Sequence, residues 1–192
     1  MDLCTPHQCH CGSLVDARGL HSFVCRRAPW RSDHALNDLI ARSFGSAGVP
    51  VTKEPIGLFW SDGKRPDGLT LVPWQSGKSL CWDVTVSCPL AESYVSEAAR
   101  EAGAAAELAA TRKEAKYADI VGRHMFEPIA VETLGVFNGS AVRLLNDLGR
   151  RISLISGDTR ETSHLYQRVS VLVQRFNAVL LYDSLPVPDC TD

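Results

Sequence analysis

Hydrophobic and polar residues alternate along the chain with two periods, one typical of helices and one typical of strands. Apolar side chains recur at helical spacing from Leu36 to Phe44, which predicts a helix capped by Asp33 and ended by Gly45 and Gly48. Strand-like runs, a long Ala- and Glu-rich helix and two C-terminal helices follow. The predicted ranges are 49–58, 65–72, 80–88 and 128–131 for strands, and 91–121, 140–156 and 159–183 for helices.

This order of elements, α-β-β-β-α-β followed by two helices, predicts an α/β fold. Residues 1–30 show neither period and are rich in Cys, His, Gly and Pro, so we expect them to form a small separate module. The main domain is predicted to span residues 31–184, with a flexible tail over 185–192. A chain of 192 residues has room for one such domain with a full hydrophobic core.

Composition narrows the classes of protein that fit. Hydrophobic residues make up 45% of the chain and charged residues 22%, which excludes a disordered tail. The net charge of -2 excludes binding of DNA through bulk charge alone. The odd number of cysteines, 7, and an N-terminus without a charged-then-apolar leader predict a protein that is neither secreted nor membrane-bound, located in the nucleus or, before import, in the cytoplasm.

Two aspartates stand where strands normally carry apolar residues. Asp67 lies in the run Lys64-Arg65-Pro66-Asp67-Gly68, and Asp83 lies in the third predicted strand on the face opposite Trp82. Neighbouring strands would bring both carboxylates within reach of one hard cation such as Mg²⁺. A turn is the alternative for Pro66-Asp67-Gly68, whereas an unpaired buried Asp83 would be costly and so suggests a role.

The long predicted helix carries the next candidate groups. Ala102, Ala106 and Ala109 form a stripe of small residues suited to packing on a sheet, and Lys113, Lys116 and Tyr117 continue that stripe at helical spacing. Both ammonium groups would then lie near the two aspartates. The alternative is that lysines late in a helix face water and complement the helix dipole.

These motifs together resemble a known family. Pro66-Asp67, then Asp83-Val84-Thr85-Val86, a long helix and Lys113-x-x-Lys116-Tyr117 are similar to the restriction-enzyme-like endonuclease domain at the C-terminus of site-specific non-LTR retrotransposon proteins. That domain belongs to the PD-(D/E)xK nuclease superfamily, whose core has the order αβββαβ. In the retroelement branch it follows a cysteine-histidine knuckle, and Cys9-His10-Cys11-Gly12 occupies the corresponding place here.

The resemblance implies roles for individual residues. Asp67 and Asp83 would hold Mg²⁺ or Mn²⁺, which activates water and stabilises charge at the scissile phosphate. Thr85 stands where the wider superfamily usually has lysine, and the retroelement branch carries that lysine on the helix, at Lys113 or Lys116. Both lysines stay open as candidates. Thr85, Tyr117 and Glu54 are further possible members of the catalytic face.

The N-terminal module is the candidate zinc site. Cys9, Cys11, His21 and Cys25 supply the four Cys and His ligands that Zn²⁺ takes in a tetrahedron, and so short a loop needs metal to stay folded. The single residue between Cys9 and Cys11 is fewer than most structural zinc sites use. Ligands that could replace one member of this set are Cys4, His7 and His10.

The resulting prediction is a metal-dependent DNA endonuclease that nicks chromosomal DNA and leaves a 3′-hydroxyl to prime reverse transcription. Its partners would be DNA, the element RNA and a reverse transcriptase module, with no membrane. The alternative is a catalytically inactive remnant that acts as a DNA-binding or protein-interaction module. Basic residues predicted to contact DNA lie beside the two metal sites, at Arg26, Arg27, Arg31, Lys64 and Arg65.

Overall fold

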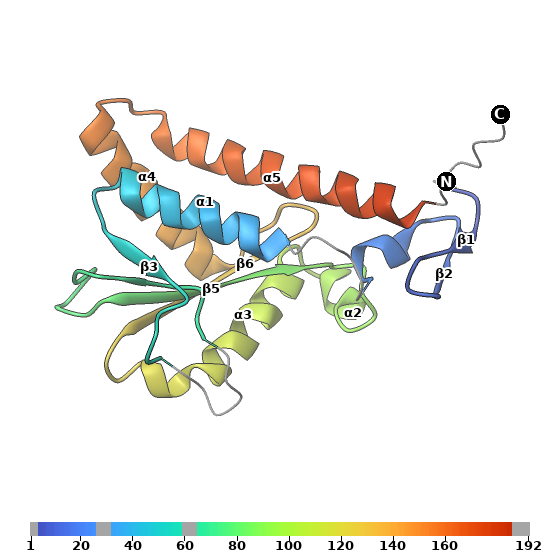
Figure 1. The fold of residues 1–192 in the computed structure, drawn as a ribbon, viewed down its shortest axis with the longest axis horizontal. Helices are drawn as coiled ribbons and strands as arrows, with labels where there is room; N and C mark the ends of the chain where they lie inside the picture. Colours follow the sequence, from blue (N-terminus) through green and yellow to red (C-terminus); the bar gives the residue numbers. More distant parts are fainter. Residues whose placement is uncertain (1–3, 26–31, 59–64, 186–192) are drawn as a thin grey trace.

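A four-stranded sheet in the order β3-β4-β5-β6 lies at the centre of the molecule (Figure 1). The computed structural model describes residues 4–25, 32–58 and 65–185. β3, β4 and β5 are antiparallel neighbours, and β6 runs parallel to β5. The predicted α/β class is therefore confirmed. The strands span Val51–Lys53 (β3), Gly68–Thr70 (β4), Leu80–Ser87 (β5) and Met125–Glu132 (β6).

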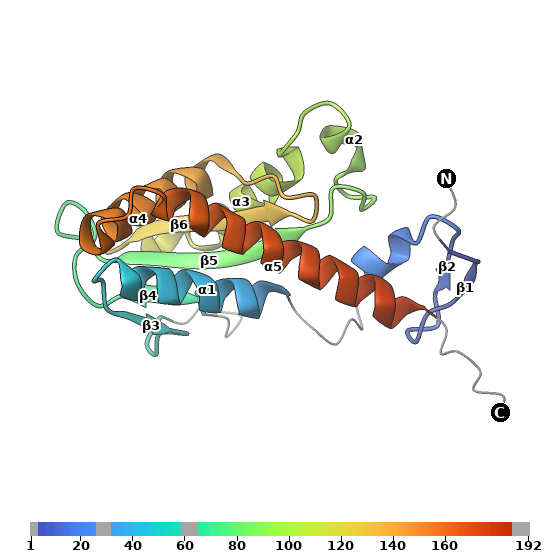
Figure 2. The same ribbon diagram turned by 90° about the horizontal axis from the view of Figure 1, so that it is seen from above.

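Helices cover both faces of this sheet (Figures 1 and 2). One face packs against α1 (Ser32–Ser46) and α4 (Gly139–Ser156), and α5 (Glu161–Ser184) packs on these two helices; all three share the main hydrophobic core with β5 and β6. The other face packs against α3 (Ala104–Lys116). In the part of the chain that the structure describes, no helix combines the length and apolar character needed to cross a bilayer.

The central strand β5 is buried on both faces, and its side chains alternate as predicted. Leu80, Trp82 and Val84 point into the main core beneath α1 and α4. Cys81 faces the opposite side, where it packs with Tyr117 at the end of α3. Asp83 also lies on that side and is only 4% exposed, so its carboxylate is enclosed between the sheet and α3.

The prediction of one helix over 91–121 was wrong. The segment contains a short α2 (Val95–Ala98), then α3, then a 3₁₀ turn at Ala118–Ile120. Gly103 separates the helices because its φ of 90° is left-handed, a conformation that glycine adopts without strain. Ala102 is exposed, and the stripe that packs on the sheet is instead Ala105, Ala106, Ala109 and Ala110.

Strand lengths also differ from the predicted ranges. β3 and β4 are only three residues each, whereas β6 is twice as long as the predicted run at 128–131. β6 extends because each of its residues pairs with β5, from Met125 opposite Leu80 to Glu132 opposite Ser87. The apolar run that predicted this strand is bounded by Glu127 and Glu132, so the hydrophobic pattern did not show that the strand continues beyond it.

The N-terminal module is built from a small hairpin and one helical turn. The hairpin joins β1 (His7–Gln8) to β2 (Leu14–Val15), and a 3₁₀ helix spans Leu20–Phe23. This module lies against the C-terminal end of α5 (Figure 1). The hydroxyl oxygens of Ser22 and Ser184 are 2.6 Å apart, and the His7 ring hydrogen-bonds the Ser184 carbonyl.

Gly68 in the Pro66-Asp67-Gly68 sequence is the first residue of β4, directly opposite Trp82. A Cβ atom at Gly68 would lie 2.0–2.4 Å from three atoms of the Trp82 ring. That ring is fully buried, stacks on Phe44 with centroids 4.7 Å apart, and donates from Nε1 to Asn37 at 2.9 Å. Glycine is required here because the indole has no room to move. The requirement therefore comes from packing against Trp82 and not from the preference of glycine for turns.

Gly68→Ala is therefore expected to lower the free energy of unfolding by about 2–3 kcal/mol or more, since the added methyl forces the Trp82 ring from its site. Urea denaturation followed by tryptophan fluorescence measures this change. Gly45→Ala is the matched control, because Gly45 lies in α1 with no atom within 4 Å of its added Cβ. The control should change stability by about 1 kcal/mol at most, in the stabilising direction. Equal stability of the Gly68→Ala variant and the native chain would contradict the packing argument.

Candidate active site

The sheet brings Asp67 and Asp83 together. Because Gly68 pairs with Trp82 in antiparallel strands, Asp67, which directly precedes β4, lies opposite Asp83 in β5. The Asp67 amide donates to the Trp82 carbonyl at 3.0 Å, which fixes this register. Both carboxylates line one pocket of about 370 Å³. The other residues around it are Asp33, His34, Glu54, Arg65, Val84, Lys113, Lys116 and Tyr117.

Asp67 is held by contacts to both its side chain and its backbone. Its Oδ2 accepts the Val84 amide at 2.7 Å, and its carbonyl accepts Nδ2 of Asn37 at 3.1 Å. Asn37 is buried in α1, and its Oδ1 accepts a hydrogen bond from Nε1 of Trp82. Contacts from both α1 and β5 therefore hold Asp67 in position. Burial, and then the negative charge of Asp83, raise the pKa of Asp67 to about 6.

Asp83 is enclosed by side chains from the last turn of α3 and from Tyr117, the residue that follows this helix. The Lys113 ammonium forms an ion pair with its Oδ2, and the Tyr117 hydroxyl lies 3.2 Å from its Oδ1. Burial and the nearby Asp83 charge raise the pKa of Tyr117, so its hydroxyl keeps its proton and can donate. Tyr117 thus does more than pack: it orients a carboxylate, and it also lies 3.1 Å from the Arg65 carbonyl.

The two candidate lysines occupy different places in the pocket. Lys113 contacts Asp83 directly, and its side chain is 29% exposed. Lys116 lies one turn further along; its ammonium is 3.2 Å from the Tyr117 hydroxyl and 4.7 Å from the centre of that ring. Both lysines line the pocket, and Lys113 is paired with the carboxylate of Asp83.

Glu54 and Thr85, the remaining candidates for the catalytic face, differ in whether they line the pocket. Glu54 lines the pocket, and its φ of 46° is unusual for a residue with a side chain. Its amide donates to the Asp67 carbonyl at 3.1 Å, which holds this backbone conformation beside the site. Thr85 follows Asp83 on the same face of β5 and does not line the pocket.

The sequence did not predict that Asp33 and His34 line the pocket. Asp33 was predicted as a helix cap, but α1 begins at Ser32 and the Asp33 carboxylate instead accepts the Val86 amide of β5 at 2.9 Å. His34, the next residue of α1, is exposed and lines the pocket. Neither carries a sequence signal for this place, because only the packing of α1 on β5 brings them to the pocket.

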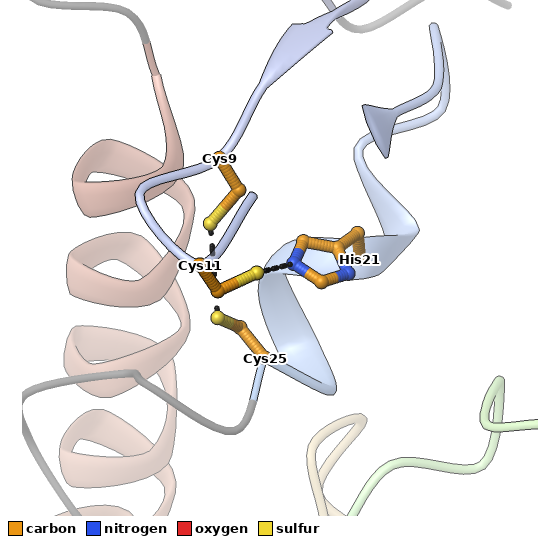
Figure 3. A group of neighbouring side chains, drawn as sticks. All are labelled: Cys9, Cys11, His21 and Cys25. Atoms are coloured by element: carbon orange, nitrogen blue, oxygen red, sulfur yellow. Dashed lines mark hydrogen bonds between the residues drawn. The ribbon is translucent and has the colours of Figure 1, made fainter. Parts of the chain in front are cut away.

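A second cluster lies in the N-terminal module, where Cys9, Cys11, His21 and Cys25 converge (Figure 3). Their ligand atoms all lie within 4.8 Å of one another, so together they could hold a metal ion. The Cys9 and Cys25 sulfurs are 3.7 Å apart, and the Cys11 sulfur is 3.1 Å from Nε2 of His21. Hydrogen bonds from Ser13 lower the pKa of the Cys11 thiol to about 6, which favours the thiolate form that binds metals.

The alternative ligands for this cluster lie elsewhere. The Cys4 thiol donates to the Asp16 carbonyl at 3.3 Å, and the ring of His7 hydrogen-bonds the carbonyls of Thr5 and Ser184. His10 is exposed and is not part of the group.

Of the basic residues predicted to contact DNA, Arg65 is exposed and lines the pocket of Asp67 and Asp83. The other four, Arg26, Arg27, Arg31 and Lys64, lie outside the described residues.

Comparison with known proteins gives no assignment for either cluster. No family model matches the chain, and no curated protein matches it.

Asp67→Asn is expected to stabilise the metal-free protein near neutral pH. Folding raises the pKa of Asp67 from 3.8 to about 6, so the group favours the folded state at low pH and this contribution is lost as the pH rises through about 6. Asparagine keeps an acceptor for the Val84 amide without the charge. The free energy of unfolding should rise by about 1–3 kcal/mol at about pH 7.5 and change little at about pH 4.

Urea denaturation in EDTA at the two pH values measures this difference. Asp119→Asn serves as the control, since Asp119 is exposed on the 3₁₀ turn outside the pocket. A loss of stability in Asp67→Asn at both pH values would contradict the expected cost of ionising Asp67 in a buried position beside Asp83.

Proposed function

We propose that the chain is a metal-dependent DNA endonuclease with a restriction-endonuclease-like αβββαβ core. The observation that carries this proposal is the convergence of Asp67, Asp83 and Lys113 in one pocket, from the residue before β4, from β5 and from α3, which are far apart in sequence. Two acids can hold a metal ion that activates water, and a nearby lysine can stabilise the charge that develops on a phosphodiester during hydrolysis. A binding module would have no need to bury Asp83 beside Lys113, so the arrangement favours an enzyme over an inactive remnant.

The pocket suits Mg²⁺ or Mn²⁺. Its donors are carboxylate oxygens, the ligands that these hard cations prefer. The pKa of Asp67 is raised by burial and then by repulsion from Asp83, and a bound cation would relieve that repulsion. Asp67 and Asp83 would hold the ion, with Glu54, which also lines the pocket, as a further oxygen donor. When bound, the ion supplies activation of water and neutralisation of charge on the phosphate oxygens.

The protein's own groups then have defined tasks. Tyr117 keeps Asp83 oriented by hydrogen bonding to Oδ1, and the Val84 amide does the same for Asp67. Lys113 places a positive charge where the pentavalent phosphate develops negative charge, and Lys116 adds a second at the pocket wall. Arg65, at the same pocket, is placed to contact a flanking phosphate.

The retroelement setting rests on the resemblance of the Pro-Asp, Asp-Val-Thr-Val and Lys-x-x-Lys-Tyr motifs together with the upstream Cys/His cluster. In that setting the enzyme acts in the nucleus and nicks target DNA. The 3′-hydroxyl that it leaves primes reverse transcription of the element RNA by a polymerase module.

Nicking of supercoiled plasmid DNA in the presence of Mg²⁺ tests the proposal. Asp83→Asn should reduce the nicking rate at least about 100-fold, because it removes a charged ligand from the site. Lys113→Met should cost about 100-fold, since Lys113 is paired with Asp83, whereas Lys116→Met should cost about tenfold or less, since Lys116 contacts the Tyr117 hydroxyl that orients Asp83. Asp119→Asn, a charge change outside the pocket, should nick like the native chain. Cutting that survives Asp83→Asn, or that needs no divalent cation, would reject the assignment.

We further propose that the N-terminal cluster is a zinc knuckle. A tetrahedron with Zn–S bonds of about 2.3 Å has sulfur atoms about 3.8 Å apart. The Cys9 and Cys25 sulfurs, at 3.7 Å, match that spacing. The module buries little apolar surface of its own, and a bound Zn²⁺ would supply the stability that its core lacks.

The purified protein is therefore expected to hold about one equivalent of zinc, measured by plasma mass spectrometry. Replacing both His21 and Cys25 by alanine should remove it. Cys4→Ser is the matched control, because the Cys4 thiol lies outside the group and donates to a carbonyl. Zinc loss in Cys4→Ser with retention in the double variant would reject this ligand set.

A further inference from the structure

The edge of β5 that faces β4 continues beyond the last pair between the two strands. β4 pairs with β5 only through Gly68 opposite Trp82 and Leu69 opposite Cys81. Within the described residues, no strand pairs with that edge after Trp82. Alternate residues of a strand direct their amides to the same edge, so the amides of Val84 and Val86 follow Trp82 there.

Carboxylate oxygens take the place of the missing strand at both amides. Val84 donates to Oδ2 of Asp67 at 2.7 Å, and Val86 donates to Oδ1 of Asp33 at 2.9 Å. The two acids therefore continue the antiparallel ladder, one acceptor per alternate residue. Without an acceptor, a backbone amide at this partly buried edge would lack a hydrogen-bond partner.

The Asp33 bond also joins two layers of the fold. Asp33 lies in the first turn of α1, which packs along β5 on the face opposite α3 (Figure 2). The same helix contributes Asn37, which binds the Asp67 backbone and the Trp82 indole. The start of α1 is thus fixed to β5 at Val86, three residues beyond Asp83.

We infer that Asp33 is a positioning residue of the pocket: by accepting the Val86 amide it holds the free edge of β5, and with it Asp83, in register with Lys113. The catalytic consequence rests on the proposed nuclease function, whereas the contact itself does not. The role belongs to the acceptor oxygen and not to the negative charge. Asparagine, which keeps that oxygen, should therefore replace Asp33, and alanine should not.

Plasmid nicking by Asp33→Ala and Asp33→Asn tests this inference. The rate at saturating DNA and Mg²⁺ is expected to fall about tenfold or more in Asp33→Ala and to stay within about threefold of the native rate in Asp33→Asn. The Mg²⁺ concentration for half-maximal activity should be the same in Asp33→Asn and the native chain. Asp38→Asn is the control, because Asp38 lies in the same helix, is paired with Lys53 on the surface and does not line the pocket.

Two results would overturn the inference. Equal loss of rate in both Asp33 variants, with a higher Mg²⁺ requirement in Asp33→Asn, would make Asp33 a direct cation ligand. Full activity of Asp33→Ala would remove any role.

Hydrogen exchange of the Val86 amide, followed by NMR, gives a readout that does not depend on activity. Exchange should be about tenfold faster in Asp33→Ala and native-like in Asp33→Asn. If the native chain does not nick DNA, the proposed function fails, and this measurement still decides the contact: equal Val86 protection in both variants would overturn it.

Discussion

The burial of Asp83 in the central strand is the constraint on which the rest of the structure depends. An ionised carboxylate that is only 4% exposed is stable only if charges and hydrogen bonds compensate for its lost hydration. Lys113 and Tyr117 supply both, so the last turn of α3 must lie directly over β5. Close packing of α3 on the sheet is therefore required by the electrostatics of the site as well as by the hydrophobic core.

Other carboxylates fix where the helices begin. Oε1 of the buried Glu132 accepts the amides of Ala105 and Ala106 at the start of α3, at 3.1 and 3.4 Å. Glu107 in α3 accepts the Gly139 amide at the start of α4, at 2.6 Å. Negative charge at a helix N-terminus is stabilised by the unpaired amides and the helix dipole. The position of Lys113 over Asp83 thus follows from where Glu132 sets the first turn of α3.

The two candidate metal clusters are joined by one helix. α5 spans 24 residues, and its first half packs in the main core through Leu165, Val169 and Val173. Its end binds the N-terminal module at Ser184 (Figure 1). At about 1.5 Å per residue, such a helix extends roughly 36 Å and holds the Cys/His cluster away from the pocket of Asp67 and Asp83. The net charge of -2 is compatible with these separate sites, because several of the acids bind backbone amides inside the fold.

The sequence by itself determined the order of the main-sheet strands and of the long helices α1, α3, α4 and α5, the placement of Asp83 on the face of β5 opposite Trp82, and the nearness of Lys113 and Tyr117. These are consequences of local periodicity, which repeats every two residues in a strand and about every 3.6 in a helix. Tertiary structure alone decided the full length of β6, the burial of Glu132 and the contact of Asp33 with Val86. Each of these depends on a partner distant in sequence, and no local pattern encodes which amide a carboxylate will meet once the layers have packed.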